Sequence, residues 1–258
     1  MAVFAHPDDE SICAGTLARL AAEGNEVRLV CATRGEQGEI IDPSIDAAVY
    51  PKGPARGLFR ERELAAACLA LGIHAPVFMD HEDSGFPISV GANNERALMN
   101  QDMRELELAV LQLVLEYRPE VMITFDPHGM YGHIDHLIIH QAASRAFWAA
   151  GGVVDTPPIR LYYPVRTIEQ VREAKLRRPG SATERLMPEV DGVSDSSVAV
   201  VCDIRAFAGQ KVAAIRAHSS QFGTPKLVDE MLERQTGSLE VERFALGGVR
   251  GSAVSGSL

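Results

Sequence analysis

The sequence predicts an α/β protein with a Rossmann-like, mostly parallel sheet that carries helices on both faces. Short apolar, β-prone runs alternate with runs of helical length over the first two thirds of the chain. Two of the expected helices are followed by glycine, a common stop signal. The length of 258 residues and a hydrophobic fraction of 46% fit one globular α/β domain with an extension.

The alternation is regular up to residue 163. Strands are expected at residues 3–5, 27–31, 77–79, 121–125 and 159–163. Helices are expected at residues 11–22, 58–71, 102–116 and 137–150. Residues 33–57 are rich in Gly, Pro and Asp and predict a long loop, and loops of that length tend to be functional or mobile.

The pattern changes after residue 165. Residues 166–196 are dominated by Pro, Ser, Gly and charged side chains and predict irregular structure. A late strand at 198–203, a late helix at 207–218 and a frayed tail from residue 247 are expected to follow. We therefore expect a Rossmann-like catalytic core at residues 1–165 and an irregular C-terminal extension at 166–258, packed on the same domain.

Charge and cysteine usage narrow the class of protein. The chain has 25 Lys and Arg against 35 Asp and Glu, a net charge of −10, so nucleic acid and anionic membranes are poor default partners. It shows no signal peptide and no apolar run of membrane-spanning length. The four cysteines form no close pair, which favours a reducing cytoplasm. Homo-oligomer formation stays open.

Two segments carry the residues for catalysis. Residues 5–10 read Ala-His-Pro-Asp-Asp-Glu directly after the first expected strand, and residues 131–136 read Tyr-Gly-His-Ile-Asp-His shortly after the fourth. In an open parallel sheet, ligands bind at the carboxyl ends of the strands. The two segments could therefore converge, although more than 120 residues separate them.

The residue types suit a single catalytic metal. A catalytic zinc takes three nitrogen or oxygen ligands from the protein and keeps one position for water. One ligand set could be His6, Asp9 and His136, and Fe²⁺ or Co²⁺ could fill the same kind of site as Zn²⁺. A two-metal phosphoesterase is disfavoured, because only one compact ligand set is visible.

The remaining polar residues of the two motifs suit hydrolysis of an amide. Asp8 fits a general base that activates the attacking water. His133, expected as an imidazolium held in one tautomer by Asp135, fits the donor that stabilises the oxyanion. Tyr131 could line the cleft and hydrogen-bond the same oxyanion.

The two motifs resemble those of the LmbE-like, PIG-L-type de-N-acetylase family. Four further segments are similar to the motifs of that family, namely residues 33–36, 60–64, 83–85 and 217–221. The resemblance implies that His6, Asp9 and His136 bind zinc, that Asp8 is the base and that His133 stabilises the transition state. It also implies that Arg60 and Asp83 contact the substrate, a role that nothing else in the sequence indicates.

Three residues depart from the family pattern, and all three lie beside the motifs. Ile134 stands where proline is usual, Phe86 where methionine is common and Met130 where glycine is common. None is an expected ligand. Phe86 and Met130 could reshape the pocket, so they bear on the identity of the substrate rather than on the chemistry.

Together these features predict a zinc-dependent hydrolase that removes an acetyl group from the amide nitrogen of a small, N-acetylglucosamine-type molecule. An amidase of thiol conjugates or of another N-acyl metabolite is the first alternative. A zinc-binding protein without catalysis is the second, and Asp8 and His133 argue against it, because neither is needed simply to hold a metal. The acyl acceptor and the physiological metal are not determined by the sequence.

Overall fold

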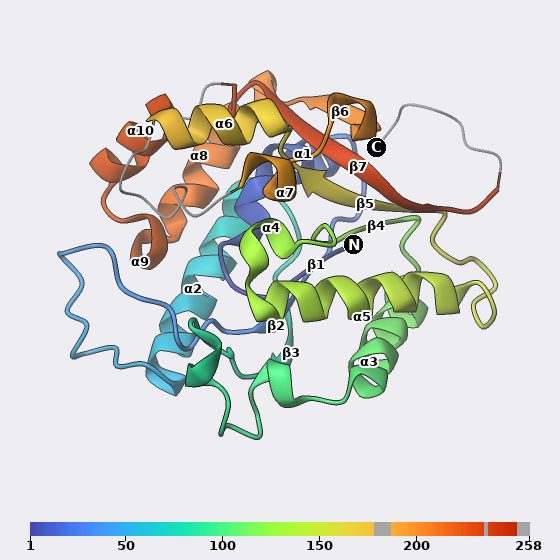
Figure 1. Ribbon diagram of the computed structural model, residues 1–258, viewed down its shortest axis with the longest axis horizontal. Coiled ribbons are helices and arrows are strands. Elements are labelled where there is room, and N and C mark those ends of the chain that lie inside the picture. The colour runs from blue at the N-terminus through green and yellow to red at the C-terminus, as the bar shows by residue number, and fades with distance from the viewer. Residues whose placement is uncertain (178–186, 235–236, 252–258) are drawn as a thin grey trace.

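The computed structural model contains one mixed sheet of seven strands in the order β3-β2-β1-β4-β5-β7-β6 (Figure 1). It describes residues 1–177, 187–234 and 237–251. The strands are β1 Ala2–Phe4, β2 Leu29–Thr33, β3 Val77–His81, β4 Val121–Ile123, β5 Arg160–Val165, β6 Val200–Asp203 and β7 Val241–Val249. The first five are parallel, whereas β7 runs antiparallel to both β5 and β6. The predicted mostly parallel sheet is thereby confirmed.

Helices cover both faces of this sheet, as predicted. The longer ones are α1 Ala14–Ala22, α2 Pro54–Leu71, α3 Met103–Tyr117, α5 Ile134–Ala150, α6 Ile168–Arg177, α8 Ala208–Ala217 and α10 Pro225–Arg234. The short ones are α4 Gly129–Gly132, α7 Pro188–Asp191 and α9 Ser219–Phe222. Helices α1, α2 and α8 pack together, and α3 packs on α5 (Figure 1). Chain order runs outward from β1 in both directions, so right-handed crossovers place the two groups on opposite faces.

Local sequence explains the ends of the main helices. Helix α2 begins one turn earlier than expected, because Pro54 occupies its first turn, where a missing N–H costs nothing. It ends at Gly72, whose φ of 71° is the left-handed conformation that glycine adopts without strain. Asp102 caps α3 by accepting the backbone N–H groups of Arg104 and Glu105.

The C-terminal third is more regular than its composition suggests. The irregular structure expected at residues 166–196 contains α6 and α7, and part of the segment, residues 178–186, lies outside the described residues. The frayed tail expected from residue 247 instead begins inside β7, and only residues 252–258 of it lie outside the description. The strand prediction failed there because Gly247 and Gly248 disfavour strands.

Packing against neighbouring aromatic rings explains these two glycines. A Cβ atom on Gly247 would lie 2.3 Å from the ring of Tyr163, and one on Gly248 would lie 2.6 Å from the ring of Phe147. Strand β7 therefore needs glycine to approach its neighbours.

Among the helices of the described residues, none is both long and apolar enough to cross a membrane.

Candidate active site

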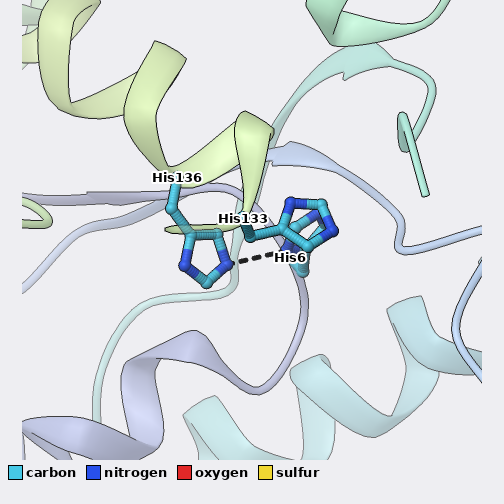
Figure 2. A group of neighbouring side chains, drawn as sticks. All are labelled: His6, His133 and His136. Atoms are coloured by element: carbon cyan, nitrogen blue, oxygen red, sulfur yellow. Dashed lines mark hydrogen bonds between the residues drawn. The ribbon is translucent and has the colours of Figure 1, made fainter. Parts of the chain in front are cut away.

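The two sequence motifs meet beside β1 and β4, where the strand order changes direction. The first motif follows β1 and forms a tight 3₁₀ turn at Asp9–Ile12 that leads into α1. The second follows β4 and forms the start of α5, with His133 as its N-cap and His136 in its first turn. Because β1 and β4 are neighbours, their carboxyl ends bring the motifs together, as expected at a switch point of an α/β sheet (Figure 2).

The three expected metal ligands face one another. Nδ1 of His6 lies 3.2 Å from Nε2 of His136. The carboxylate of Asp9 lies 3.5 Å from Nδ1 of His6 and 3.2 Å from Nε2 of His136. Ligands of a tetrahedral zinc, with bonds of about 2.0–2.1 Å, lie about 3.3 Å apart, so the spacing fits such an ion.

Hydrogen bonds on the far side of the His6 and His136 rings also favour a metal ion between them. His136 donates from Nδ1 to the carbonyl oxygen of Gly129 at 3.0 Å, which leaves a lone pair on Nε2. Nε2 of His6 donates to Asp135 at 3.1 Å, which leaves a lone pair on Nδ1. With both rings in these neutral tautomers, the lone pairs of His6 Nδ1 and His136 Nε2 and the carboxylate of Asp9 face one another. This arrangement of acceptors fits a cation and is otherwise repulsive.

Asp135 orients His6, in contrast to the expected contact with His133. Its Oδ2 lies against Nε2 of His6 and also accepts the backbone N–H of Ser84 at 3.0 Å. Asp83 approaches the same nitrogen of His6, with Oδ1 at 3.4 Å. The first turn of α5 directs the Asp135 carboxylate toward the first motif, so only its backbone N–H reaches His133.

The contacts of His133 orient it as a neutral hydrogen-bond donor. Its Nδ1 accepts the backbone N–H of Asp135 at 3.2 Å, so the proton of the neutral ring lies on Nε2. Burial, together with the neighbouring rings of His6 and His136, lowers the pKa of His133 to about 4. The geometry therefore favours a neutral imidazole, in contrast to the imidazolium expected from the sequence.

Asp8 lies between the two ligands of the first motif and is held in an unusual conformation. Its φ of 111° is in the left-handed region, which residues other than glycine adopt rarely. Its carboxylate lies 3.2 Å from Nη2 of Arg60. Burial raises the pKa of Asp8 to about 6, and Arg60 opposes that rise. A carboxylate with this pKa can accept a proton near neutral pH.

Arg60 is a buried part of the framework around Asp8. It is 3% exposed, and it donates to the carbonyl oxygens of Pro7 at 2.5 Å and Gly35 at 2.8 Å. A Cβ atom on Gly35 would lie 1.9 Å from the guanidinium, so the loop after β2 needs glycine there. Arg60 thus fixes both the first motif and this loop.

Asp83 is likewise engaged with protein groups. It accepts the backbone N–H groups of Gln37 and Gly85, and it is 4% exposed. Direct contact of Arg60 and Asp83 with substrate hydroxyls therefore stays a prediction. Their observed contacts support a positioning role around Asp8 and His6.

A large cavity opens beside the histidines. Its volume is about 920 Å³, and its wall includes His133, Tyr131, Phe86 and Met130. Side chains of the C-terminal region also line it, among them Ile215, Phe222, Leu227, Met231 and Arg243. Tyr131 is about half exposed, and its ring centre lies 5.1 Å from that of His136 and 6.1 Å from that of His133. Phe86 and Met130, two of the three residues that depart from the family pattern, thus do line the cavity.

Two buried residues near Asp8 were not predicted as part of the site. Glu10, the last residue of the first motif, accepts the backbone N–H of Asp8 at 3.1 Å. His218, at the end of α8, is fully buried and lies 2.6 Å from Glu10. The similarity of residues 217–221 to a family motif was the one signal in the sequence that pointed to His218.

Comparisons with known proteins agree with this geometry. The family model of GlcNAc-PI de-N-acetylases, PIG-L, matches residues 1–147. A 1D-myo-inositol 2-acetamido-2-deoxy-alpha-D-glucopyranoside deacetylase of Nocardiopsis dassonvillei is 35% identical over 260 residues, covering 95% of this chain and 87% of the relative.

Solved structures show the same fold. An N,N'-diacetylchitobiose deacetylase from Pyrococcus horikoshii has a TM-score of 0.63 at 17% identity, over 95% of this chain and 82% of that one. A 4-carboxy-2-hydroxymuconate hydratase from Pseudomonas putida has a TM-score of 0.61 at 18% identity, over 98% and 97%. Because a deacetylase and a hydratase are both similar, these neighbours establish the fold, and the reaction must be argued from the site.

Proposed function

Because the chain belongs to the GlcNAc-PI de-N-acetylase (PIG-L) family, we propose that it is a zinc-dependent deacetylase acting on an N-acetylglucosamine-type small molecule. The observation that carries the proposal is the convergence of two imidazole nitrogens and one carboxylate beside Asp8. A protein that only stored a metal would have no use for a base of raised pKa beside the ligands.

The proposed metal ligands are His6, Asp9 and His136. Their nitrogen and oxygen donors suit Zn²⁺, and Fe²⁺ or Co²⁺ would be accepted by the same set. A bound ion of this kind would polarise the acetyl carbonyl and lower the pKa of the attacking water. Asp135 supports the set through Nε2 of His6.

The protein's own residues supply the proton transfers and the oxyanion contact. Asp8 would take the proton of the attacking water and deliver it to the leaving amine nitrogen. His133 would donate from Nε2 to the carbonyl oxygen as negative charge develops there. Tyr131, which lines the cavity, would donate a hydrogen bond from its hydroxyl group to the same oxygen.

The cavity supports a substrate larger than a simple acetamide. An acetyl group offers a methyl group, a carbonyl group and one N–H, so most of the binding energy must come from the remainder of the molecule. A volume of about 920 Å³ beside His133 would hold a sugar ring together with a substituent on it. The substrate in the name of the Nocardiopsis relative, an acetamido-glucopyranoside of inositol, has this two-ring form. The four cysteines, all buried and free, support a cytoplasmic location.

A substrate series tests this proposal. Metal-loaded protein would be given N-acetylglucosamine, its inositol glycoside and N-acetylcyclohexylamine, and the free amine and the acetate would both be measured. We expect the glycoside to have the highest kcat/KM and the hydroxyl-free amide the lowest. Equal or faster turnover of N-acetylcyclohexylamine would refute the amino-sugar assignment while leaving amide hydrolysis intact. Preference for a thiol-linked N-acyl conjugate would support an amidase instead.

A further inference from the structure

We propose that His218, in the C-terminal region, is a positioning residue that holds Asp8 in its working conformation through Glu10. The proposal rests on the role of Asp8 as general base. It goes beyond that role because it assigns a function to two buried residues that touch neither the expected metal ligands' donor atoms nor the cavity.

The contact between His218 and Glu10 is short and fully enclosed. Nε2 of His218 lies 2.6 Å from Oε1 of Glu10, and the two residues are 0% and 1% exposed. A carboxylate can only accept, so His218 donates from Nε2. In the described part of the chain, Nδ1 of His218 has no hydrogen-bond partner. The imidazole is therefore committed to Glu10 alone.

Glu10, held by His218, in turn binds the backbone of Asp8. Its second oxygen, Oε2, accepts the backbone N–H of Asp8 at 3.1 Å. The φ of 111° at Asp8 lies in a region that residues with a side chain rarely adopt, so the surrounding structure must hold it there. The hydrogen bond from Asp8 to Glu10 is one of the contacts that do so.

The unusual backbone at Asp8 has a functional reason. In extended chain, the side chains of successive residues point in opposite directions, yet Asp8 and Asp9 both serve one site. The left-handed turn at Asp8 allows both carboxylates to face it. Arg60 holds the same turn from the other side, through the carbonyl oxygen of Pro7 and the carboxylate of Asp8.

His218 also joins this turn to the wall of the cavity. It ends α8 and precedes α9, and Ile215 and Phe222 of these helices line the cavity. The Phe222 ring centre lies 6.4 Å from that of His218. The segment that would contact the substituent of the substrate thus also supports the base.

Two substitutions separate positioning from packing. His218→Gln keeps an N–H donor near the position of Nε2, whereas His218→Leu keeps the bulk and removes the donor. Loss of a hydrogen bond to a charged group corresponds to roughly a ten- to hundredfold loss of kcat. We expect that loss for His218→Leu, with KM within about twofold, metal content unchanged and most of the activity regained in His218→Gln.

A double-mutant cycle with Asp8→Asn identifies the residue through which His218 acts. If His218 acts only through Asp8, then His218→Leu should cost less than about twofold in kcat when Asp8 is already Asn. An equal loss in both backgrounds would overturn the proposal. Ser220→Ala is the matched control, because it removes a contact to Glu63 of 2.5 Å from the next turn without touching Glu10, and its kcat should stay within about twofold of the parent.

A crystal structure of His218→Leu provides a readout that does not depend on the reaction. We expect Asp8 to leave the left-handed region or its carboxylate to move away from Arg60. An unchanged Asp8 together with unchanged kcat would refute the positioning role. Failure of the wild-type protein to release acetate from any acetamido sugar would refute the proposed function instead, and the backbone at Asp8 would still be tested by this structure.

Discussion

The imidazole of His6 is held between a carboxylate on one side and the expected metal ligands on the other. Its Nε2 lies 3.1 Å from Oδ2 of Asp135, while its Nδ1 lies 3.2 Å from Nε2 of His136. A carboxylate on the far nitrogen fixes the tautomer of a ligating histidine and raises its basicity. We therefore expect the carboxylate of Asp135 to act on the proposed metal site rather than on His133.

This contact makes Asp135 a determinant of metal affinity. In Asp135→Asn, His6 loses its charged acceptor, and we expect the dissociation constant of Zn²⁺ to rise by about ten- to a hundredfold. Competition with a chromophoric chelator would measure it. Glu107→Gln, which alters a buried carboxylate on α3 away from the site, is the control. An unchanged affinity for Zn²⁺ in Asp135→Asn would contradict this prediction and would favour the alternative that Asp135 orients His133.

The ligand set is tested by comparing two of the proposed ligands, Asp9 and His136, with His133. Asp9→Ala and His136→Ala should each lose most of the bound metal, because each removes one of three donors. His133→Ala should retain it, although His133 also lies close to His6 and His136. Elemental analysis after gel filtration distinguishes the two sets. Metal loss in His133→Ala, with retention in Asp9→Ala, would show that three histidines form the site.

Asp8→Asn separates the base from the ligands. The substitution keeps the size of the side chain and removes its ability to accept a proton, so kcat should fall by about 10²–10⁴ with metal content unchanged. Steady-state acetate release together with elemental analysis gives both quantities. Near-normal turnover in this variant would place the base elsewhere.

The pH profile should report the titration of Asp8. Because burial raises its pKa to about 6 and only the ionised form accepts a proton, kcat/KM should fall as the pH drops below about 6. Arg60 lowers this pKa, so Arg60→Met should move the acid limb to higher pH. Arg60→Lys keeps the charge and should move it less. An acid limb that stays in place in Arg60→Met would assign it to another group.

The fold could be predicted as far as hydrophobic pattern determines it. Strands β1, β2, β4 and β5 are short apolar runs between turn residues, and the sequence located each within a few residues. Strand β7 could not be found in this way, because Gly247 and Gly248 are selected by close packing against Tyr163 and Phe147. Such contacts arise only once the chain is folded.

The candidate site, like the fold, could be predicted only in part from the sequence. The sequence predicted that the two motifs would converge, because both follow strands of one parallel sheet. It could not predict which residue the Asp135 carboxylate contacts, since this depends on how the first turn of α5 is rotated toward β1. The contact between Glu10 and His218 joins residues 208 positions apart, and no local pattern in the sequence encodes it.

The central claim is metal-dependent removal of an acetyl group from an amino sugar. The most direct test is to strip the protein with a chelator, restore it with one equivalent of Zn²⁺, and measure acetate and free amine released from the inositol glycoside of N-acetylglucosamine in each state. We predict equal amounts of acetate and amine, little turnover in the stripped protein and recovery with zinc. Folded, zinc-loaded protein that releases neither product, or stripped protein that is equally active, would contradict it.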